Sequence, residues 1–203
     1  DGISDRYYQT IEHGTYGGRL MDGDLFGYAM NPNCMIDGPS QFDFYSGGGL
    51  DIAFLGFGEI DAAGNVNVSK LAGNTVGPGG FIDIAQNANT VVFCGTFDTG
   101  GTRLEIGKGR LEISTHGRIA KLVSEVDQIT FSGAQALTQG QRIIYVTERV
   151  VFELTEEGVS LIEIAPGVDL ERDILNRMGF APHISEAPRV MDRLLFTDVE
   201  GEI

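Results

Sequence analysis

The sequence predicts an α/β domain with a mostly parallel central sheet, flanking helices and a β-rich C-terminal portion. Two runs of strand length, residues 51–56 and 90–94, are continuously apolar, which is typical of strands whose two faces are both covered. Between them, residues 80–87 place apolar side chains at positions 81, 84 and 85, a helical spacing. After residue 101, short segments alternate between polar and apolar residues, which indicates further strands.

The first half of the chain is organised around a glycine turn. Residues 1–100 hold most of the glycine and asparagine, in turns between short apolar runs. The order strand, glycine turn, helix and strand follows from residues 51–94. A helix that begins at Gly79-Gly80 directs free backbone amides toward whatever lies beside it.

The second half is predicted to be mainly β. A hairpin is expected because two alternating segments flank Gly107-Lys108-Gly109, namely residues 102–106 and 110–114. Further strands are expected at residues 142–147, 150–154 and 159–164. Residues 118–127 fit either a helix or a strand.

The end of the chain is predicted to be peripheral. Asp169 is suited to cap a short helix that runs through Met178 and stops at Gly179. Pro182, Pro188 and the acidic end then indicate a tail outside the core.

Composition limits the partners. The chain has 203 residues, 29 of them glycine, about twice the usual share of ~7%. Its net charge of −15 disfavours nucleic acid and anionic membranes, which both need a basic surface. Any phosphate must therefore be bound by local backbone amides or by another polypeptide.

Cysteine content points to a reducing compartment. Cys34 and Cys94 are the only cysteines, and we expect two free thiols in a cytoplasmic protein, with Cys94 in a buried strand. No metal site is expected, because the two cysteines and three histidines have unrelated spacings. The N-terminus shows no charged-then-apolar leader and no apolar run approaches ~18 residues, so we expect neither a signal peptide nor a membrane span.

Glu12 is the leading candidate for chemistry. It stands between an apolar lead-in and the glycine-rich turn that ends in Gly17-Gly18, and glycine allows the backbone to approach a substrate closely. A second cluster, Gly77-Pro78-Gly79-Gly80, opens an apolar segment. Together the two clusters suggest acyl chemistry on a thioester.

These clusters belong to a series of ordered motifs that resembles the family I CoA-transferases. The series begins at Glu12-His13-Gly14 and extends over almost the whole chain. Its other members are residues 37–56, 61–69, 77–81, 128–133, 145–149 and 162–170. The strongest resemblance is to the C-terminal, β-like half of the fused acetate/propionate, or short-chain acyl, CoA-transferases.

The resemblance implies a ping-pong mechanism with Glu12 as the nucleophile. In such enzymes the glutamate attacks an acyl-CoA and then carries CoA as a glutamyl thioester, so CoA is a covalently attached co-substrate and no cofactor is bound permanently. The family's glycine-rich loop corresponds to Gly77, Gly79 and Gly80, with one amide of Gly79 or Gly80 expected to stabilise the oxyanion. A carboxylate is already ionised near neutral pH, so it needs no general base.

Weaker candidates for the substrate pocket are His13, Gly14, Asn31 and Gln41. His13 departs from the smaller polar residue expected at its position, and it either shapes the acyl pocket, tunes Glu12 or is a passive neighbour. Asn31 and Gln41 either bind substrate or hold turns. Without the resemblance, a glutamate in a glycine-rich turn such as Glu12 is usually a solvated turn residue, and the second glycine cluster could be no more than the start of a helix.

The resemblance assigns residues 1–203 to one catalytic half, without the family's N-terminal α-like half. That half normally supplies part of the CoA and substrate pocket, so this chain is expected to be a separate subunit or a piece of a longer protein. We expect acyl-CoA and a short-chain carboxylate as substrates, the α-like half as a partner and assembly into a homo-oligomer. Two alternatives stay open: an acyl-CoA hydrolase, and a catalytically silent binding or scaffold subunit.

Overall fold

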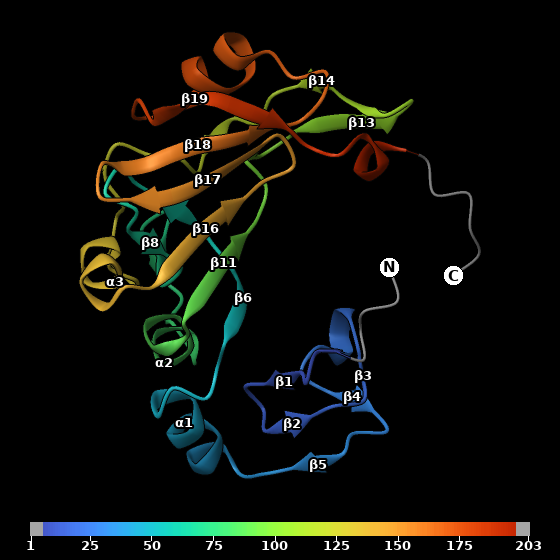
Figure 1. Ribbon diagram of the computed structural model, residues 1–203, viewed down its shortest axis with the longest axis vertical. Coiled ribbons are helices and arrows are strands. Elements are labelled where there is room, and N and C mark those ends of the chain that lie inside the picture. Colours follow the sequence, from blue (N-terminus) through green and yellow to red (C-terminus); the bar gives the residue numbers. More distant parts are fainter. Residues whose placement is uncertain (1–5, 198–203) are drawn as a thin grey trace.

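A six-stranded mixed sheet forms the centre of the protein (Figure 1). The structure, a computed structural model, describes residues 6–197. Strand order in the sheet is β19-β18-β17-β16-β11-β6, and the pairs β6–β11, β11–β16 and β18–β19 are parallel. The strands span Ile52–Gly56 (β6), Thr90–Cys94 (β11), Arg142–Val146 (β16), Val150–Thr155 (β17), Gly158–Ile164 (β18) and His183–Val190 (β19).

Two short helices cover one face of this sheet. They are α2 (Phe81–Asn87) and α3 (Gly133–Gln139). The buried ring of Phe81 stacks on Phe93 with centroids 5.7 Å apart, and Ala136 belongs to the same core. The predicted strand–turn–helix–strand unit is therefore confirmed.

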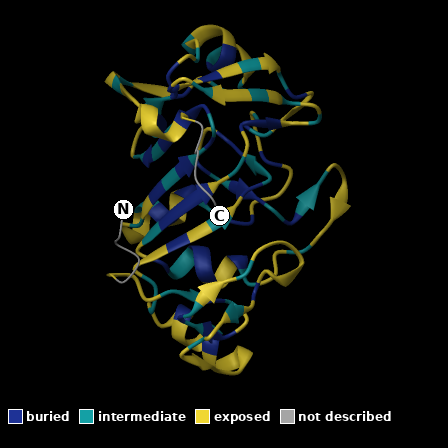
Figure 2. Ribbon diagram, turned by 90° about the vertical axis from the view of Figure 1, so that its right-hand side faces the viewer, coloured by how far each residue is buried: buried dark blue, intermediate teal, exposed yellow. Residues whose placement is uncertain are grey.

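The opposite face is partly uncovered at β6. Side chains alternate between faces along a strand, so Phe54 points away from the core-facing Ala53 and Leu55. Phe54 is 67% exposed. Figure 2 shows burial concentrated along the central strands and exposed residues prevailing in the N-terminal region.

Residues 10–46 form a small lobe that carries the Glu12 turn. The strands β1 (Thr10–Ile11), β2 (Thr15–Tyr16) and β5 (Cys34–Met35) make a three-stranded antiparallel sheet. The strands β3 (Arg19–Leu20) and β4 (Ala29–Met30) pair beside it, with the turn η2 (Gly23–Leu25) between them. Helix α1 (Gly38–Ser46) follows, capped by the Asp37 carboxylate, which accepts from the Ser40 amide.

Small antiparallel elements complete the fold. The predicted hairpin is present as β13 (Arg103–Gly107) and β14 (Arg110–Thr115). The other pairs are β7 (Glu59–Ile60) with β8 (Val66–Asn67), β9 (Lys70–Leu71) with β10 (Asn74–Thr75), and β12 (Asp98–Thr99) with β15 (Ile119–Ala120). The last pair resolves the ambiguous region 118–127, which is mostly irregular apart from β15.

Two predictions for the second half need correction. Residues 183–190 are not a tail, because β19 pairs in parallel with β18 at the sheet edge; the acidic end at residues 198–203 lies outside the described residues. Asp169 does cap the next segment, as predicted. That segment is a short π-helix, η3 (Leu170–Ile174), followed by a 3₁₀ helix, η4 (Leu175–Arg177), in place of one helix through Met178. A last 3₁₀ turn, η5, covers Arg193–Phe196.

Cysteine placement is partly as predicted. Cys34 and Cys94 are free thiols. Cys94 is exposed rather than buried, because it ends β11 after the buried residues Val91 and Phe93.

In the part of the chain that the structure describes, no helix has the length and apolarity to cross a membrane.

Candidate active site

Glu12 begins the three-residue turn that joins β1 to β2. Ile11 pairs with Thr15 across the hairpin, and the turn closes where the Gly14 amide donates to the Ile11 carbonyl oxygen at 2.9 Å. Gly14 has φ +90°, a left-handed conformation that favours glycine. A Cβ at this position would lie 2.1 Å from the Ile36 carbonyl oxygen. The turn can therefore pack this closely on β5 only with glycine at residue 14.

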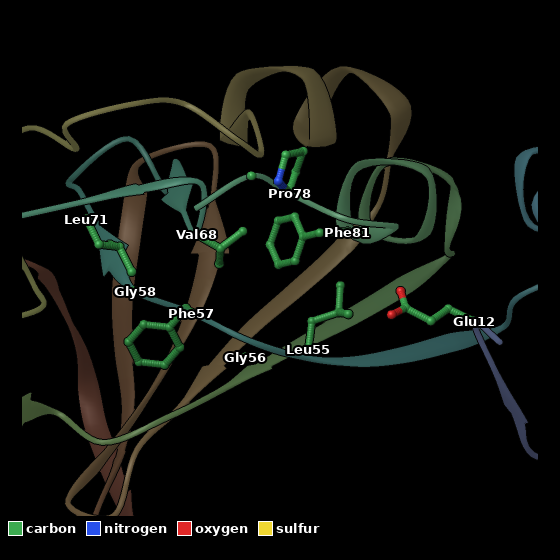
Figure 3. A pocket seen from close by; sticks show the side chains of 10 residues that line it. Glu12, Leu55, Gly56, Phe57, Gly58, Val68, Leu71, Pro78 and Phe81 are labelled. Atoms are coloured by element: carbon green, nitrogen blue, oxygen red, sulfur yellow. The ribbon is translucent and has the colours of Figure 1, made fainter. Parts of the chain in front are cut away.

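The Glu12 side chain points into a pocket of about 420 Å³ (Figure 3). The pocket lies at the carboxyl end of β6, where Leu55 and Gly56 contribute to its wall. Ligands of open α/β sheets bind at the carboxyl ends of the strands, so this location fits the fold. The apolar lining residues are Leu55, Phe57, Val68, Leu71, Pro78 and Phe81. Glu12 thus presents a carboxylate to a mainly apolar space.

The glycine turn before α2 lies beside this carboxylate. A Cβ on Gly80 would lie 2.6 Å from Glu12 Oε2, so the carboxylate fits here because residue 80 has no side chain. The amides of Gly79 and Gly80 donate to no acceptor within residues 6–197. Both amides are therefore free to donate, although Gly79 and Gly80 are not among the residues that line the pocket.

Gly77 differs from the other two glycines. Its amide donates to the Ser69 carbonyl oxygen at 3.2 Å, so it is already paired. Gly77 still lines the pocket. Its contribution on this chain is to the wall of the pocket, and the donor role predicted for Gly79 or Gly80 stays a prediction.

Three of the weaker candidates lie outside the pocket lining. His13 is exposed, and its Nδ1 would be 2.6 Å from a Cβ on Gly27, so the imidazole covers that glycine. Gly14, the last residue of the turn, is buried. Asn31 is exposed next to β4 with φ +52°, a left-handed value that asparagine tolerates in turns. The structure thus gives His13 a packing role and Asn31 a turn role.

Gln41 is also placed outside the pocket, in a structural position on α1. Its side chain is fully buried. Its Nε2 donates to Thr10 Oγ1 at 2.8 Å and to the Ile11 carbonyl oxygen at 3.1 Å. Tyr45 lies next to it, with its hydroxyl 3.2 Å from Thr10 Oγ1. Burial raises the pKa of the Tyr45 hydroxyl, so this group stays protonated.

Sequence reasoning missed the apolar wall of the pocket. Leu55 and Phe57 lie at the end of a predicted strand, and the carboxyl-end rule for parallel sheets could have identified them. Val68 and Leu71 come from β9 and the residues before it, which carried no periodic signal. Phe81 was predicted as a helix residue but not as part of the site.

No family model matches the sequence. Among curated proteins, the acetate CoA-transferase YdiF of Escherichia coli O157:H7 is 48% identical over 198 residues, which cover 98% of this chain and 37% of that protein. The caffeate CoA-transferase of Acetobacterium woodii is 46% identical over 202 residues, covering 97% of this chain and 38% of that protein. The chain therefore spans just over a third of the length of these relatives.

Comparison with solved structures likewise finds CoA-transferases. The apoenzyme of the acyl-CoA transferase YdiF from Escherichia coli O157:H7 matches with a TM-score of 0.92 and 46% identity, over 98% of this chain and 38% of that one. A thioester complex of the same enzyme with CoA matches with a TM-score of 0.90 over 97% of this chain and 37% of that one. By sequence and by fold, this chain belongs to the family I CoA-transferases.

Proposed function

We propose that the protein containing this chain transfers CoA between an acyl-CoA and a free carboxylate, with Glu12 as the nucleophile. The observation that carries this proposal is the position of the Glu12 carboxylate against Gly80, beside an apolar pocket, in a turn where the amides of Gly79 and Gly80 have no acceptor among the described residues. Membership of the CoA-transferase family and the CoA thioester complex of a relative support it.

The proposed reaction has two half-reactions. Glu12 attacks the acyl-CoA carbonyl, the C–S bond breaks, and the products are an acyl-glutamyl anhydride and CoA thiolate. The thiolate then attacks the glutamyl carbonyl of the anhydride and expels the first carboxylate, which leaves CoA on Glu12 as a thioester. An acceptor carboxylate runs the same two steps in reverse. No proton has to move, because the attacking and leaving groups are anions throughout.

Each step passes through a tetrahedral oxyanion next to Glu12. The amides of Gly79 and Gly80 are the donors proposed to bind it, since they have no other acceptor in the described chain. Loss of one such donor typically costs about 2.7–4 kcal/mol of transition-state stabilisation. The net charge of −15 makes local amides more important here, because the surface as a whole repels an anion.

The apolar wall is proposed to hold the acyl or pantetheine chain. Leu55, Val68 and Phe81 line the pocket that the Glu12 carboxylate faces, with Leu55 nearest to it (Figure 3). Burial of apolar substrate surface there contributes about 25 cal/mol per Å². Short-chain carboxylates remain the proposed substrates. The relatives named for acetate and for caffeate have nearly equal identity to this chain, so the acceptor must be found by assay.

We propose that activity needs the α-like half. The pocket is open to solvent on this chain, and Phe54 leaves part of one sheet face uncovered, whereas parallel sheets are normally covered on both faces. β6 is the edge strand of the sheet, and its carboxyl end at Leu55 and Gly56 lines the pocket, so a partner that extends over this edge would also lie next to the pocket. Assembly into a homo-oligomer and a cytoplasmic location stay predictions from the sequence.

The decisive experiment measures the protein mass after treatment with acetyl-CoA in the presence of the complementary half. We expect an adduct of CoA on the peptide that contains Glu12, and none in the Glu12→Gln variant. An adduct at another residue, or full activity in Glu12→Gln, would refute the assignment. Thioester loss with and without added acetate separates transfer from hydrolysis, since a hydrolase needs no acetate. The isolated chain serves as the control for the role of the α-like half.

A further inference from the structure

Helix α1 contacts both the hairpin that carries Glu12 and the glycine turn that faces it. We propose that Gln41, on this helix, is a positioning residue that fixes Glu12 relative to the amides of Gly79 and Gly80. The inference rests on the proposed function, because it assigns a role in the reaction of Glu12. Three observations support it, and none of them places Gln41 in contact with substrate.

The first observation is the bond between Gln41 and the closing carbonyl of the turn. The Ile11 carbonyl oxygen accepts from the Gly14 amide at 2.9 Å and from Gln41 Nε2 at 3.1 Å. Ile11 immediately precedes Glu12, so this oxygen is the point where the turn is closed. Gln41 therefore holds the backbone one peptide unit away from the nucleophile.

The second observation is that the same amide also fixes the preceding residue. Gln41 Nε2 donates to Thr10 Oγ1 at 2.8 Å, and the Tyr45 hydroxyl lies 3.2 Å from the same oxygen. Gln41 and Tyr45 are one helical turn apart on α1 and both are buried. Strand β1 is thus fastened to the helix at two consecutive residues.

The third observation is on the next residue of the helix. Phe42 Cζ would lie 2.6 Å from a Cβ on Gly80, the same distance as Glu12 Oε2. The Phe42 ring therefore packs against Gly80 from α1. Adjacent residues of one helix, Gln41 and Phe42, hold the nucleophile turn and the donor turn, so α1 sets the separation between the two.

The energetics of Gln41 favour a role beyond packing. Its Oε1 is buried and has no hydrogen-bond partner among the described residues, and such a group is costly to bury. An apolar side chain of similar shape would avoid that cost. For stability alone, Gln41 is a poor choice at a fully buried site. Both protons of its amide, in contrast, reach acceptors on β1.

The test uses Gln41→Met in the protein that contains this chain together with its complementary half. Methionine has a similar length but cannot donate, so the hairpin loses both hydrogen bonds from Gln41 and keeps only the contact of Thr10 with the Tyr45 hydroxyl. We expect kcat to fall about 10- to 100-fold, as for a displacement of the order of 1 Å, with KM changed less than threefold. Formation of the glutamyl-CoA adduct, followed by mass in single turnovers, should slow by the same factor.

A stability control separates positioning from general loosening. Val159 lies buried in β18, away from the hairpin, and Val159→Ala is expected to lower the melting temperature with kcat unchanged. If Gln41→Met lowers the melting temperature but leaves kcat as in Val159→Ala, Gln41 is merely structural and the inference is wrong. If kcat falls equally in both variants, it is also wrong.

A second variant keeps the test valid if Gln41→Met folds poorly. Gln41→Glu retains the shape, and its carboxyl can donate one hydrogen bond only while protonated. We expect kcat relative to the unchanged protein to be highest at low pH and to fall as the buried carboxyl ionises. A ratio independent of pH would count against the inference.

The two proposals fail in different ways. If the unchanged protein forms no adduct on Glu12, the proposed function fails and Gln41 has no reaction to support. If the adduct forms and Gln41→Met produces it at the original rate, only the positioning role is refuted.

Discussion

A single methyl group at residue 80 should separate catalysis from folding. Gly80 has φ −81° and ψ 2°, which alanine adopts without strain. The added Cβ would lie 2.6 Å from Glu12 Oε2, whereas ordinary contact begins at 3.4 Å. The carboxylate, at the end of a flexible side chain, must therefore retreat by about 0.8 Å.

This displacement gives the expected magnitude. A misplacement of about 1 Å can cost about 100-fold in rate, which corresponds to about 2.7 kcal/mol of activation free energy. The Phe42 ring, whose Cζ would also lie 2.6 Å from the new Cβ, must shift as well, and such overpacking typically costs about 1–3 kcal/mol of folding free energy. We therefore expect Gly80→Ala to stay folded with a moderately lower melting temperature and to lose most of its kcat.

The assay compares Gly80→Ala with Gly38→Ala, a matched change at the start of α1. A Cβ on Gly38 would meet no atom within 4 Å, so this variant should be active and stable. Both are assayed for kcat, for single-turnover adduct formation on Glu12 and for thermal unfolding by circular dichroism. Wild-type kcat in Gly80→Ala would refute the reasoning, because the Glu12 carboxylate would then not need its place beside residue 80.

Three further predictions concern other parts of the chain. Phe54→Asp should weaken association with the complementary half in sedimentation or titration, because it charges the uncovered sheet face; unchanged affinity would place that contact elsewhere. Tyr145→Phe should lower the free energy of unfolding by about 1–3 kcal/mol in urea titrations, because the buried hydroxyl donates to the Gly64 carbonyl oxygen at 2.7 Å; a neutral result would mean that this carbonyl finds another donor. Hydrogen bonds from Arg172 hold the pKa of the Asp173 carboxyl at about 2. The stabilisation by that carboxylate is therefore complete above the unfolded-state pKa of about 3.9 and is lost as the pH falls toward 2. Arg172→Ala should therefore unfold at a higher pH than the unchanged protein in acid titrations. An unchanged midpoint pH of acid unfolding would contradict this.

The parallel core could be predicted from the sequence because its signals are local. Residues 51–56 and 90–94 are apolar without alternation, and as β6 and β11 they pair in parallel with Gly56 opposite Cys94. The hairpin around Gly107-Lys108-Gly109 was likewise predicted from alternation and turn residues. Burial on both faces is confirmed for β11, whereas β6 is the edge strand and leaves Ile52 and Phe54 exposed, contrary to the prediction.

Other elements depend on tertiary context. Helix α1 was not predicted, although Asp37 as an N-cap and Pro39 in the first turn are both helix-start signals. Strand β19 was wrongly interpreted as a tail because Pro188 suggested an interruption. At a sheet edge a proline is tolerated, and the register of β19 shifts between the partners Leu161 and Glu163.

In the candidate site, too, some features could be predicted from the sequence and others depend on tertiary contacts. Glu12 and Gly80 are 68 residues apart in the sequence, and no spacing rule predicts that they meet. The resemblance to a family suggested that both belong to one site, and the structure places Glu12 Oε2 next to Gly80. Gln41 was predicted either to bind substrate in the pocket or to hold a turn. Its burial and its bonds to β1 could be known only from the folded chain.

The chemistry of the proposed intermediates explains why the position of Glu12 must be held so closely. An acyl-glutamyl anhydride and a glutamyl thioester both react with water, so transfer prevails over hydrolysis only if the acceptor carboxylate reaches the carbonyl before water does. On this chain the pocket beside Glu12 is open, and its own residues cannot exclude water from it. The hairpin, α1 and the Gly79-Gly80 turn can fix where the carbonyl lies, but the cover must come from another part of the protein. The ratio of transfer to hydrolysis should therefore depend on the complementary half, whereas the rate of attack by Glu12 should depend on residues of this chain.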